Sequence, residues 1–326
     1  MGYNKNNFKR IREEFATKHK IAEAAADRRR AELHAALPEV AQIDAQLAKT
    51  GLSLMGAALL DNAARERRMK ELREENLRLN AERDAILTRN GYPADYSDVK
   101  YDCPLCSDSG YVGIMMCECM KRALTLAGFE SSGIGKNIEN QSFDNFSLDY
   151  YKNDERTLRG MASVLDACRQ FADTFDPKAS QNLLMIGGTG LGKTHLSSSV
   201  ARRVIERGYD VCYTTAIDMF ADFETEQFGN RVSRGEFTDK YFDCDLHILD
   251  DLGTELTNQF TVSCLYNLLN VRINHRLPMI VNTNLDQKTF MQTYSDRITS
   301  RLFGEFIPLA FTGIDVRRQK LQGKRS

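Results

Sequence analysis

The chain has 326 residues, of which 42% are hydrophobic and 27% are charged, and its formal net charge is −1. This length allows about two domains with sizeable cores. No apolar run approaches the roughly 20 residues that a membrane-spanning helix requires. The first residues lead into charge without the apolar core of a signal peptide, so we expect a soluble, cytoplasmic protein with no membrane contact. Because the net charge is close to zero, the protein as a whole does not attract nucleic acid electrostatically. Contact with nucleic acid therefore requires a local basic patch.

Residues 1–98 predict a helical N-terminal region. Apolar residues recur seven positions apart at Leu72, Leu79 and Ile86. Asn76 and Arg83 interrupt the second apolar seam, which favours a short helical hairpin or a partner-binding helix over a long coiled coil. Gly51 and Gly56 are expected to mark a break between helices. An ordinary small helical bundle and a docking module are both open interpretations of this region.

A cysteine cluster defines the next segment, residues 99–120. It consists of two close pairs separated by residues 107–116, and its members are Cys103, Cys106, Cys117 and Cys119. Each pair presents thiolates from one tight turn, and a glycine-containing hairpin can bring the pairs together, as a tetrahedral Cys₄ zinc site requires. The second pair is C-x-C, an imperfect match to the commonest zinc ribbon, and buried reduced thiols or a redox pair are the alternatives. A closed Cys₄ set leaves no open coordination position, so we expect the zinc to be structural.

The other four cysteines are scattered and are expected to be small apolar residues of the core. They are Cys168, Cys212, Cys244 and Cys264. Residues 121–150 look like a linker, in which Phe143 and Phe146 are expected to pack against the domain that follows.

Residues 151–326 alternate between helical and strand patterns. The expected helices span 155–175, 193–207, 217–227, 259–275 and 288–302. The expected strands span 182–186, 211–215, 246–249, 279–283 and 307–311. Apolar, mostly β-branched runs between amphipathic helices predict an α/β domain whose parallel sheet is covered on both faces, a three-layer arrangement.

A glycine-rich turn follows the first of these strands and fits the phosphate-binding pattern G-x-x-x-x-G-K-[ST]. Its glycines let backbone N–H groups point at an anion, and the N-terminus of the following helix adds partial positive charge. Lys193 is placed to reach the β- and γ-phosphates of ATP, and the Thr194 hydroxyl to bind Mg²⁺. The expected nucleotide-binding residues are Gly187, Gly188, Thr189, Gly190, Leu191, Gly192, Lys193, Thr194, His195 and Asp250.

Two carboxylates, Asp250 and Asp251, follow the expected strand at 246–249. Acids at the carboxyl edge of a strand lie where open α/β sheets bind ligands. We expect Asp250 to hold Mg²⁺ together with Thr194, and Asp251 to orient and activate the attacking water. Because aspartate is shorter than the more usual glutamate, hydrolysis is expected to be slow.

Three consecutive polar residues lie at the end of the strand expected at 279–283. Among Asn282, Thr283 and Asn284 we favour Asn284 as a contact to the γ-phosphate or the water, with a turn-forming asparagine as the alternative. Arg297 and Arg301 lie four residues apart on one face of a helix. An arginine offered to the γ-phosphate of a neighbouring subunit would neutralise charge in the transition state, whereas solvated surface arginines are the alternative.

These motifs together resemble AAA+ ATPases, in particular the DnaC/DnaI-type replicative helicase loaders and the related IstB transposition ATPases. The resemblance covers roughly residues 140–320 and includes the run Asp250–Glu255 and the Ser300-Arg301-Leu302 box. It implies an ATPase with a Walker A lysine at Lys193, Walker B acids at Asp250 and Asp251, sensor 1 at Asn284 and an arginine finger at Arg301. The cysteine cluster resembles the zinc-containing N-terminal region of DnaI-type loaders.

The resemblance also implies partners and cofactors. The N-terminal region would grip a hexameric DnaB-type helicase, the AAA+ domain would touch single-stranded DNA and assemble with copies of itself, and the cofactors would be ATP, Mg²⁺ and Zn²⁺. The leading hypothesis is therefore an ATP-controlled helicase loader. The alternatives are an IstB-like regulator of transposition and a small-molecule P-loop kinase, which would have no use for Asn284 and Arg301.

The sequence departs from the family after Arg301. Only 25 residues follow it, too few for the helical lid that many AAA+ proteins carry. Arg317 or Arg318 is a candidate substitute for the sensor 2 residue. The basic tail that contains them is expected either to contact DNA phosphate or to be a solvated terminus.

Overall fold

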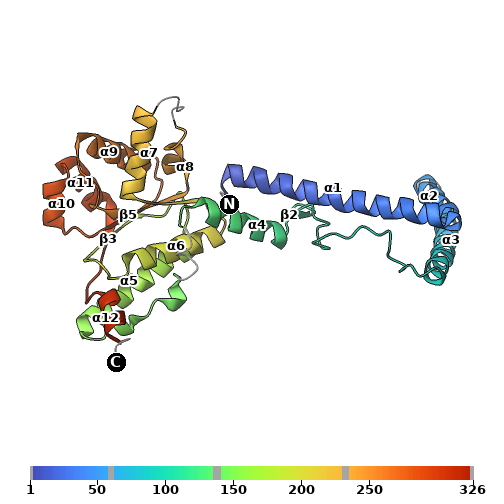
Figure 1. Ribbon diagram of the computed structural model, residues 1–326, viewed down its shortest axis with the longest axis horizontal. Helices are drawn as coiled ribbons and strands as arrows, with labels where there is room; N and C mark the ends of the chain where they lie inside the picture. Colours follow the sequence, from blue (N-terminus) through green and yellow to red (C-terminus); the bar gives the residue numbers. More distant parts are fainter. Residues whose placement is uncertain (1–2, 58–61, 135–140, 230–234, 324–326) are drawn as a thin grey trace. The chain divides into compact units, whose positions relative to one another are not determined.

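The computed structural model describes residues 3–57, 62–134, 141–229 and 235–323 of the chain. These residues form two compact units: Arg12–Cys119, and Met1–Ile11 together with Met120–Ser326 (Figure 1). The contacts divide the chain between Cys119 and Met120, at one of the expected boundaries (98, 120 and 150), and also after Ile11, because the first turns of the N-terminal helix pack with the C-terminal unit. No helix in the described ranges is long and apolar enough to cross a membrane.

Helices dominate the unit Arg12–Cys119, as the sequence predicts. A small apolar core unites three fully buried side chains, Leu33, Val40 and Leu87. The helices are α1 (Lys5–Ala36), α2 (Pro38–Ala57) and α3 (Asn62–Arg89).

The polar residues that interrupt the apolar seam of α3 pair with α2. The Thr50 hydroxyl donates to Asn76 Oδ1 at 2.6 Å, and Arg83 Nε donates to Asp44 Oδ1 at 2.8 Å. The two leucines of the seam are each 1% exposed, Leu72 and Leu79. The predicted helical hairpin is thus present, and these polar pairs fix the positions of α2 and α3 along each other.

The expected helix break at Gly51 is wrong. Helix α2 continues through Gly51 and Gly56 to Ala57. A glycine weakens a helix interior by roughly 1 kcal/mol but does not by itself end the helix. Residues 58–61, which separate α2 from α3, lie outside the described residues.

A helix also occupies the first part of the predicted linker. Helix α4 (Glu118–Ser131) is followed by two short 3₁₀ turns, η2 (Phe143–Asn145) and η3 (Leu148–Tyr151). Its buried face repeats at helical spacing through Met120, Leu124 and Ala127. Because this apolar face is buried, residues 121–131 form a helix that packs on its neighbours, and the interpretation of these residues as a linker is wrong.

The centre of the C-terminal unit is a parallel sheet, as predicted. The strands are β3 (Asn182–Ile186), β4 (Val211–Thr215), β5 (Leu246–Leu252), β6 (Met279–Thr283) and β7 (Phe306–Ala310). They lie in the order β4-β5-β6-β3-β7, with every neighbouring pair parallel. Strand β5 runs past the expected end at residue 249, and a register shift between Leu249 and Leu252 lies where the two acids stand.

Helices cover both faces of this sheet. Alternate strand residues face opposite cores, so Leu183 and Met185 belong to one hydrophobic cluster and Leu184 to the other. Figure 1 shows α5 and α6 on one side of the sheet and α7, α9 and α11 on the other. The helices are α5 (Glu155–Asp173), α6 (Lys193–Glu206), α7 (Ala216–Phe228), α8 (Asp239–Asp243), α9 (Gln259–Asn274), α10 (Gln287–Thr293), α11 (Asp296–Glu305) and α12 (Val316–Gly323). Phe143 and Phe146 pack against the first cluster, as expected.

The helix expected at 288–302 is two helices, α10 and α11. The Asp286 carboxylate caps α10 by accepting from the Thr289 N–H at 2.7 Å, and extended backbone at Tyr294 and Ser295 separates the two. After β7, the described residues contain one further helix, α12.

Candidate functional site

The glycine-rich turn connects β3 to α6 and has the backbone conformation of an anion cradle. Gly190 and Gly192 have φ values of 77° and 90°, in the left-handed region that favours glycine. A Cβ at Gly190 would lie 2.1 Å from Asp315 Oδ1, and one at Gly192 would lie 2.8 Å from the Phe146 ring. Both positions therefore require glycine, and Gly192 directly precedes the N-terminus of α6.

The Lys193 ammonium is buried at the centre of the turn. The residue is 5% exposed, and Nζ donates to Gly187 O at 2.7 Å, Gly188 O at 2.8 Å and Asn284 Oδ1 at 2.6 Å. Burial lowers the pKa of Lys193, while the negative charges of Asp251 and Asp250 oppose that shift. The positive charge of Lys193 is thus held at the centre of the turn by neutral oxygen acceptors, which a phosphate can replace.

Strand β5 brings Asp250 to Thr194, the second residue of α6. Asp250 is 4% exposed, and its Oδ1 accepts from Asn282 Nδ2 at 2.7 Å and from the Thr194 hydroxyl at 3.4 Å. Its Oδ2 accepts from the Tyr213 hydroxyl at 2.6 Å. The structure therefore joins Thr194 and Asp250, the two residues predicted to share a Mg²⁺ ion, although they are 56 positions apart.

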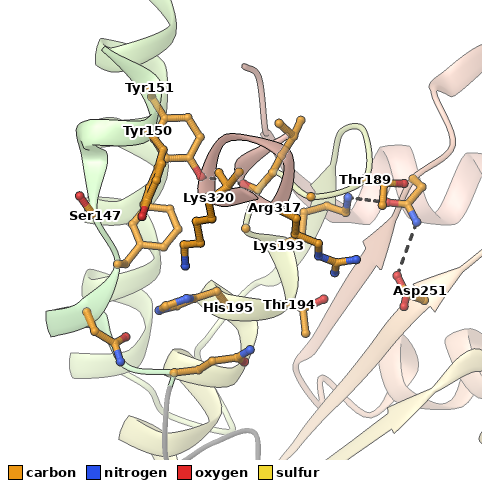
Figure 2. Close-up of a pocket in the computed structure, with 18 residues that line it drawn as sticks. Ser147, Tyr150, Tyr151, Thr189, Lys193, Thr194, His195, Asp251, Arg317 and Lys320 are labelled. Carbon is orange, nitrogen blue, oxygen red and sulfur yellow. Dashed lines mark hydrogen bonds between the residues drawn. The ribbon is translucent and has the colours of Figure 1, made fainter. Parts of the chain in front are cut away.

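Asp251, the next residue of β5, lines a cleft beside the glycine-rich turn. It has a positive φ of 56°, and Asn284 Nδ2 lies 3.5 Å from its Oδ1. Burial, and then the adjacent Asp250 charge, raise the pKa of Asp251 from its ordinary value of 3.8. Asn284 thus bridges Lys193 and Asp251, contacts that Figure 2 draws as dashed lines.

The three polar residues at the end of β6 have different environments. Asn282 is buried against Asp250, and the Thr283 hydroxyl donates to Leu252 O at 2.8 Å. Asn284 is the one that reaches the cleft. The geometry therefore supports the choice of Asn284 among the three.

Seven consecutive residues of the predicted set line the cleft: Thr189, Gly190, Leu191, Gly192, Lys193, Thr194 and His195. Gly187 and Gly188 lie behind it and supply the carbonyls that accept from Lys193. His195 Nε2 lies 2.9 Å from Ser142 O, and burial lowers the pKa of the ring, which favours its neutral form.

The tyrosines and the serine in the far wall of the cleft were not predicted. Figure 2 shows Ser147, Tyr150 and Tyr151 on one side and α12 with Arg317 and Lys320 near them. The Tyr151 hydroxyl donates to Leu191 O at 2.9 Å, 40 positions away, and ties this wall to the glycine-rich turn. The sequence carried two signals for this wall, the expected packing of Phe143 and Phe146 and the candidate sensor 2 residue Arg317. No motif marks the tyrosines.

The C-terminal helix α12 closes the remaining side. The Val316 N–H donates to Gly190 O at 2.9 Å, and the Lys320 ammonium lies 5.4 Å from the centre of the Tyr150 ring. Arg317 lines the cleft, whereas the Arg318 side chain is 82% exposed and lies 3.9 Å from the Asp315 carboxylate. Of the two candidates for a sensor 2 substitute, Arg317 is the one at the site.

Arg301 lies outside this cleft. On α11, its guanidinium stacks on the Tyr266 ring at 5.2 Å and donates to the Tyr266 hydroxyl at 3.4 Å. Arg297, one turn earlier, is exposed. A role for Arg301 in ATP hydrolysis therefore requires the site of another subunit.

The four cysteines of the unit Arg12–Cys119 converge. All four Sγ atoms lie within 4.8 Å of one another, with Cys103–Cys117 at 3.9 Å and Cys106–Cys119 at 3.5 Å. A tetrahedral zinc site with Zn–S bonds of about 2.3 Å separates its sulfurs by about 3.8 Å, so these residues fit zinc. The backbone amide of Cys106 lowers the pKa of Cys103 to about 7.

A turn and a short hairpin hold this cluster together. The Asp108 carboxylate accepts from the backbone N–H groups of Asp102 and Cys103 at 2.9 and 2.8 Å. Strands β1 (Tyr111–Val112) and β2 (Met115–Met116) form the predicted hairpin between the pairs. Of the other cysteines, Cys264 is half-buried and three are buried as expected, Cys168, Cys212 and Cys244.

The parallel sheet, the glycine-rich turn after β3, the acids after β5 and the asparagine after β6 define an AAA+-type P-loop ATP-binding domain. Residues 145–303 match the family described as IstB-like ATP binding protein. The chain is also similar to the replicative helicase loader DnaC of Escherichia coli (strain K12), with 22% identity over 199 residues that cover 60% of this chain and 76% of DnaC. These matches support a DnaC-type AAA+ protein and confirm the resemblance that the motifs predict.

Two further comparisons concern replication proteins. The chromosomal replication initiator protein DnaA of Campylobacter fetus subsp. fetus (strain 82-40) is 29% identical over 145 residues, 42% of this chain and 33% of DnaA. Among solved structures, a crystal structure of the DnaC helicase loader matches with a TM-score of 0.47 and 18% identity, covering 55% of this chain and 100% of that one.

Proposed function

We propose that the cleft binds and hydrolyses ATP and that the hydrolysis acts as a switch. The observation that carries this proposal is the convergence of Lys193, Thr194 and Asp250 with Asp251 and Asn284 at one end of the sheet. Backbone amides of the glycine-rich turn and the Lys193 ammonium would bind the phosphates. Thr194 and Asp250 would hold a Mg²⁺ ion, which neutralises phosphate charge when bound.

In this proposal Asp251 accepts the proton of the attacking water. Its raised pKa suits a general base, because a more basic carboxylate takes a proton more readily. Asn284 contacts both Lys193 and Asp251 and would orient the water and the γ-phosphate relative to each other. Arg317 would add positive charge from α12.

We expect nucleotide affinity in the absence of Mg²⁺ to fall as the pH rises. Phosphate binding uses the charged form of Lys193, and its pKa lies below the ordinary value of 10.5, so the charge is lost at a lower pH than in an exposed lysine. Titration of a fluorescent ATP analogue in EDTA from about pH 8 to 10 measures the effect. Lys193→Arg keeps its charge throughout this range and is the matched control; an equally steep decline in both proteins would contradict the assignment.

We further propose that the protein loads a DnaB-type hexameric helicase onto single-stranded DNA. The similarity to a protein named replicative helicase loader supports this proposal. Residues 1–98 would bind the helicase, and the AAA+ domain would contact single-stranded DNA and assemble with further copies of itself. ATP would order neighbouring subunits, and hydrolysis would release the helicase.

Light scattering after size exclusion tests the loader proposal. The full chain is mixed with the replicative helicase of the same cell in ATP and Mg²⁺. We expect a complex with several copies per helicase hexamer, and its loss when residues 1–120 are removed. If no nucleotide condition gives a complex, the loader proposal fails.

The second candidate is an IstB-like regulator that assembles on DNA and directs a transposase. The match of residues 145–303 to IstB-like ATP binding proteins favours it specifically. It predicts assembly on DNA that depends on ATP and does not require the helicase.

We propose that Arg301 acts on ATP in a neighbouring subunit, and we expect Arg301→Ala to spare nucleotide binding. DNA-stimulated turnover should fall on the order of 1000-fold, as with arginine fingers elsewhere. The measurement compares steady-state phosphate release with the affinity for ATP. The control Arg159→Ala removes an exposed arginine of α5 that pairs with Glu155. Turnover equal to that of the wild type would remove Arg301 from this role.

We also propose that the cysteine cluster holds a structural zinc ion. The sulfur separations support it, as does the Asp108 carboxylate, which fixes the backbone of the first cysteine pair. With four thiolates bound, no position would be left for a substrate, so the ion would stabilise the fold.

A further inference from the structure

Tyr213 of β4 contacts an acid of the site from behind the cleft. Its hydroxyl donates to Asp250 Oδ2 at 2.6 Å and lies 3.2 Å from Ser197 Oγ. The residue is 9% exposed, and burial together with the Asp250 charge holds the pKa of Tyr213 well above its usual value. The phenol is therefore a permanent hydrogen-bond donor to this carboxylate at neutral pH.

This donor fixes the orientation of the Asp250 carboxylate. Oδ2 is bound to Tyr213, so Oδ1 is the oxygen that faces Asn282 at 2.7 Å and Thr194 at 3.4 Å. A carboxylate whose two oxygens bind different donors cannot rotate freely. The oxygen that would share Mg²⁺ with Thr194 is thus held in place by a hydroxyl on the opposite side.

The backbone of Tyr213 is in turn bound to the segment that follows α4. Among the described strands, β4 lies at the edge of the sheet, so its outward N–H groups face no other strand of that set. The Tyr213 N–H donates to Ser132 O at 2.7 Å, directly after the last residue of α4. Ser132 is 1% exposed, and its own hydroxyl donates to Phe129 O at 2.9 Å within α4.

At the next residue, Gly133, the backbones of the two segments lie so close that neither can move independently of the other. Gly133 has a φ of 78°, and a Cβ there would lie 2.5 Å from Tyr213 O. Ile134 is buried in the hydrophobic cluster that also contains Tyr213. The end of α4 and the centre of β4 are therefore packed as one piece.

The other end of α4 is continuous with the cysteine cluster. Cys119 is the second residue of α4, which begins at Glu118. Near the C-terminal end of α4, the Ala127 carbonyl accepts a hydrogen bond from Asn7 Nδ2 of α1 at 3.0 Å. A chain of bonded and packed residues thus leads from the cysteines through α4 to Ser132, Tyr213 and Asp250.

We propose that Tyr213 is a positioning residue that couples the end of α4 to the Asp250 carboxylate, so that a shift of α4 changes the affinity of the site for Mg²⁺. This inference rests on the proposed binding of ATP with Mg²⁺. It assigns a regulatory input to that site, namely the segment that joins it to the cysteine cluster.

Tyr213→Phe tests the positioning role, because it removes the hydroxyl and keeps the ring. The Mg²⁺ concentration that gives half-maximal ATP turnover should rise on the order of 10-fold, as for other residues that orient a metal ligand. Affinity for ATP in EDTA should remain that of the wild type. Tyr209→Phe is the matched control, since the Tyr209 ring packs on Phe175 in the same unit, and it should show neither change.

Hydrogen exchange tests the coupling first in the wild-type protein alone and then in Tyr213→Phe. Mg²⁺ with ATP should slow exchange in residues 129–134, which do not line the cleft, more than ATP in EDTA does. This difference should vanish in Tyr213→Phe.

A Mg²⁺ requirement of Tyr213→Phe within twofold of the wild type would overturn the positioning role. Equal exchange of residues 129–134 with and without Mg²⁺ would overturn the coupling. Failure of the wild-type protein to bind ATP at all would instead refute the proposed function, so the two failures are distinguishable.

Discussion

Lys193→Ala is expected to lower the affinity for ATP on the order of 100-fold and to abolish measurable turnover. A charge-assisted hydrogen bond contributes about 1.5–3 kcal/mol, and the ammonium is the buried cation at the centre of the turn. In the protein without nucleotide its partners are the carbonyls of Gly187 and Gly188 and the amide oxygen of Asn284. These are neutral groups, so a phosphate gains strongly from replacing them. Equilibrium titration with a fluorescent ATP analogue and a phosphate-release assay measure the two effects.

The control for this variant is Lys288→Ala, which removes an exposed lysine of α10. It should bind ATP as the wild type does. Thermal unfolding of Lys193→Ala without nucleotide should remain cooperative, because the substitution removes a buried charge instead of creating one. Unchanged ATP affinity in a folded Lys193→Ala protein would mean that the cleft is not the nucleotide site.

Cys103→Ser is expected to reduce bound zinc from about one ion per chain to a small fraction of that and to unfold the segment around residues 102–119. In small zinc modules, metal binding contributes on the order of 10 kcal/mol to folding, and removal of one of four thiolates opens the coordination shell. The Cys103 backbone is also bound to Asp108, so the first turn loses its anchor when the metal leaves. Elemental analysis of the purified chain and hydrogen exchange over this segment measure the result.

Cys264→Ser is the matched control, because Cys264 is half-buried and lies far along the chain from the cluster. It should retain zinc. Binding of ATP by Cys103→Ser in EDTA should persist, since the cleft belongs to the other unit and the proposed coupling through α4 acts on Mg²⁺. Full zinc content in Cys103→Ser would exclude the Cys₄ site.

Local sequence patterns predicted most of the C-terminal unit. The ends of four of the five strands agree to within one residue, since each strand is a short apolar run bounded by turn residues. The bounds of α10 and α11 were missed because Tyr294 and Ser295, which separate the two helices, lie within the single helix expected at 288–302. The interpretation of residues 121–150 as a linker overlooked α4, although its buried residues Met120, Leu124 and Ala127 recur at helical spacing.

The residues of the site also fall into those that a local motif predicts and those that it does not. The glycine-rich turn, Lys193 and Thr194 are contiguous and carry a recognisable spacing, so their role can be inferred before any fold is known. The walls formed by Tyr150, Tyr151 and α12 carry no such spacing. Tyr151 meets Leu191 across 40 positions, and no local pattern records a contact of that kind.

The sequence by itself thus determined the phosphate-binding turn, the acids after β5, the cysteine pairs and the five strands of the parallel sheet. These features depend on conformations and spacings within a few neighbouring residues. Only the tertiary structure decided that Tyr213 holds Asp250, that Asn284 and not Asn282 reaches the cleft, and that Arg317 faces it while Arg318 faces solvent. Each of these depends on which strand lies beside which and on which side of it a residue faces, and both are set by the packing of the whole unit.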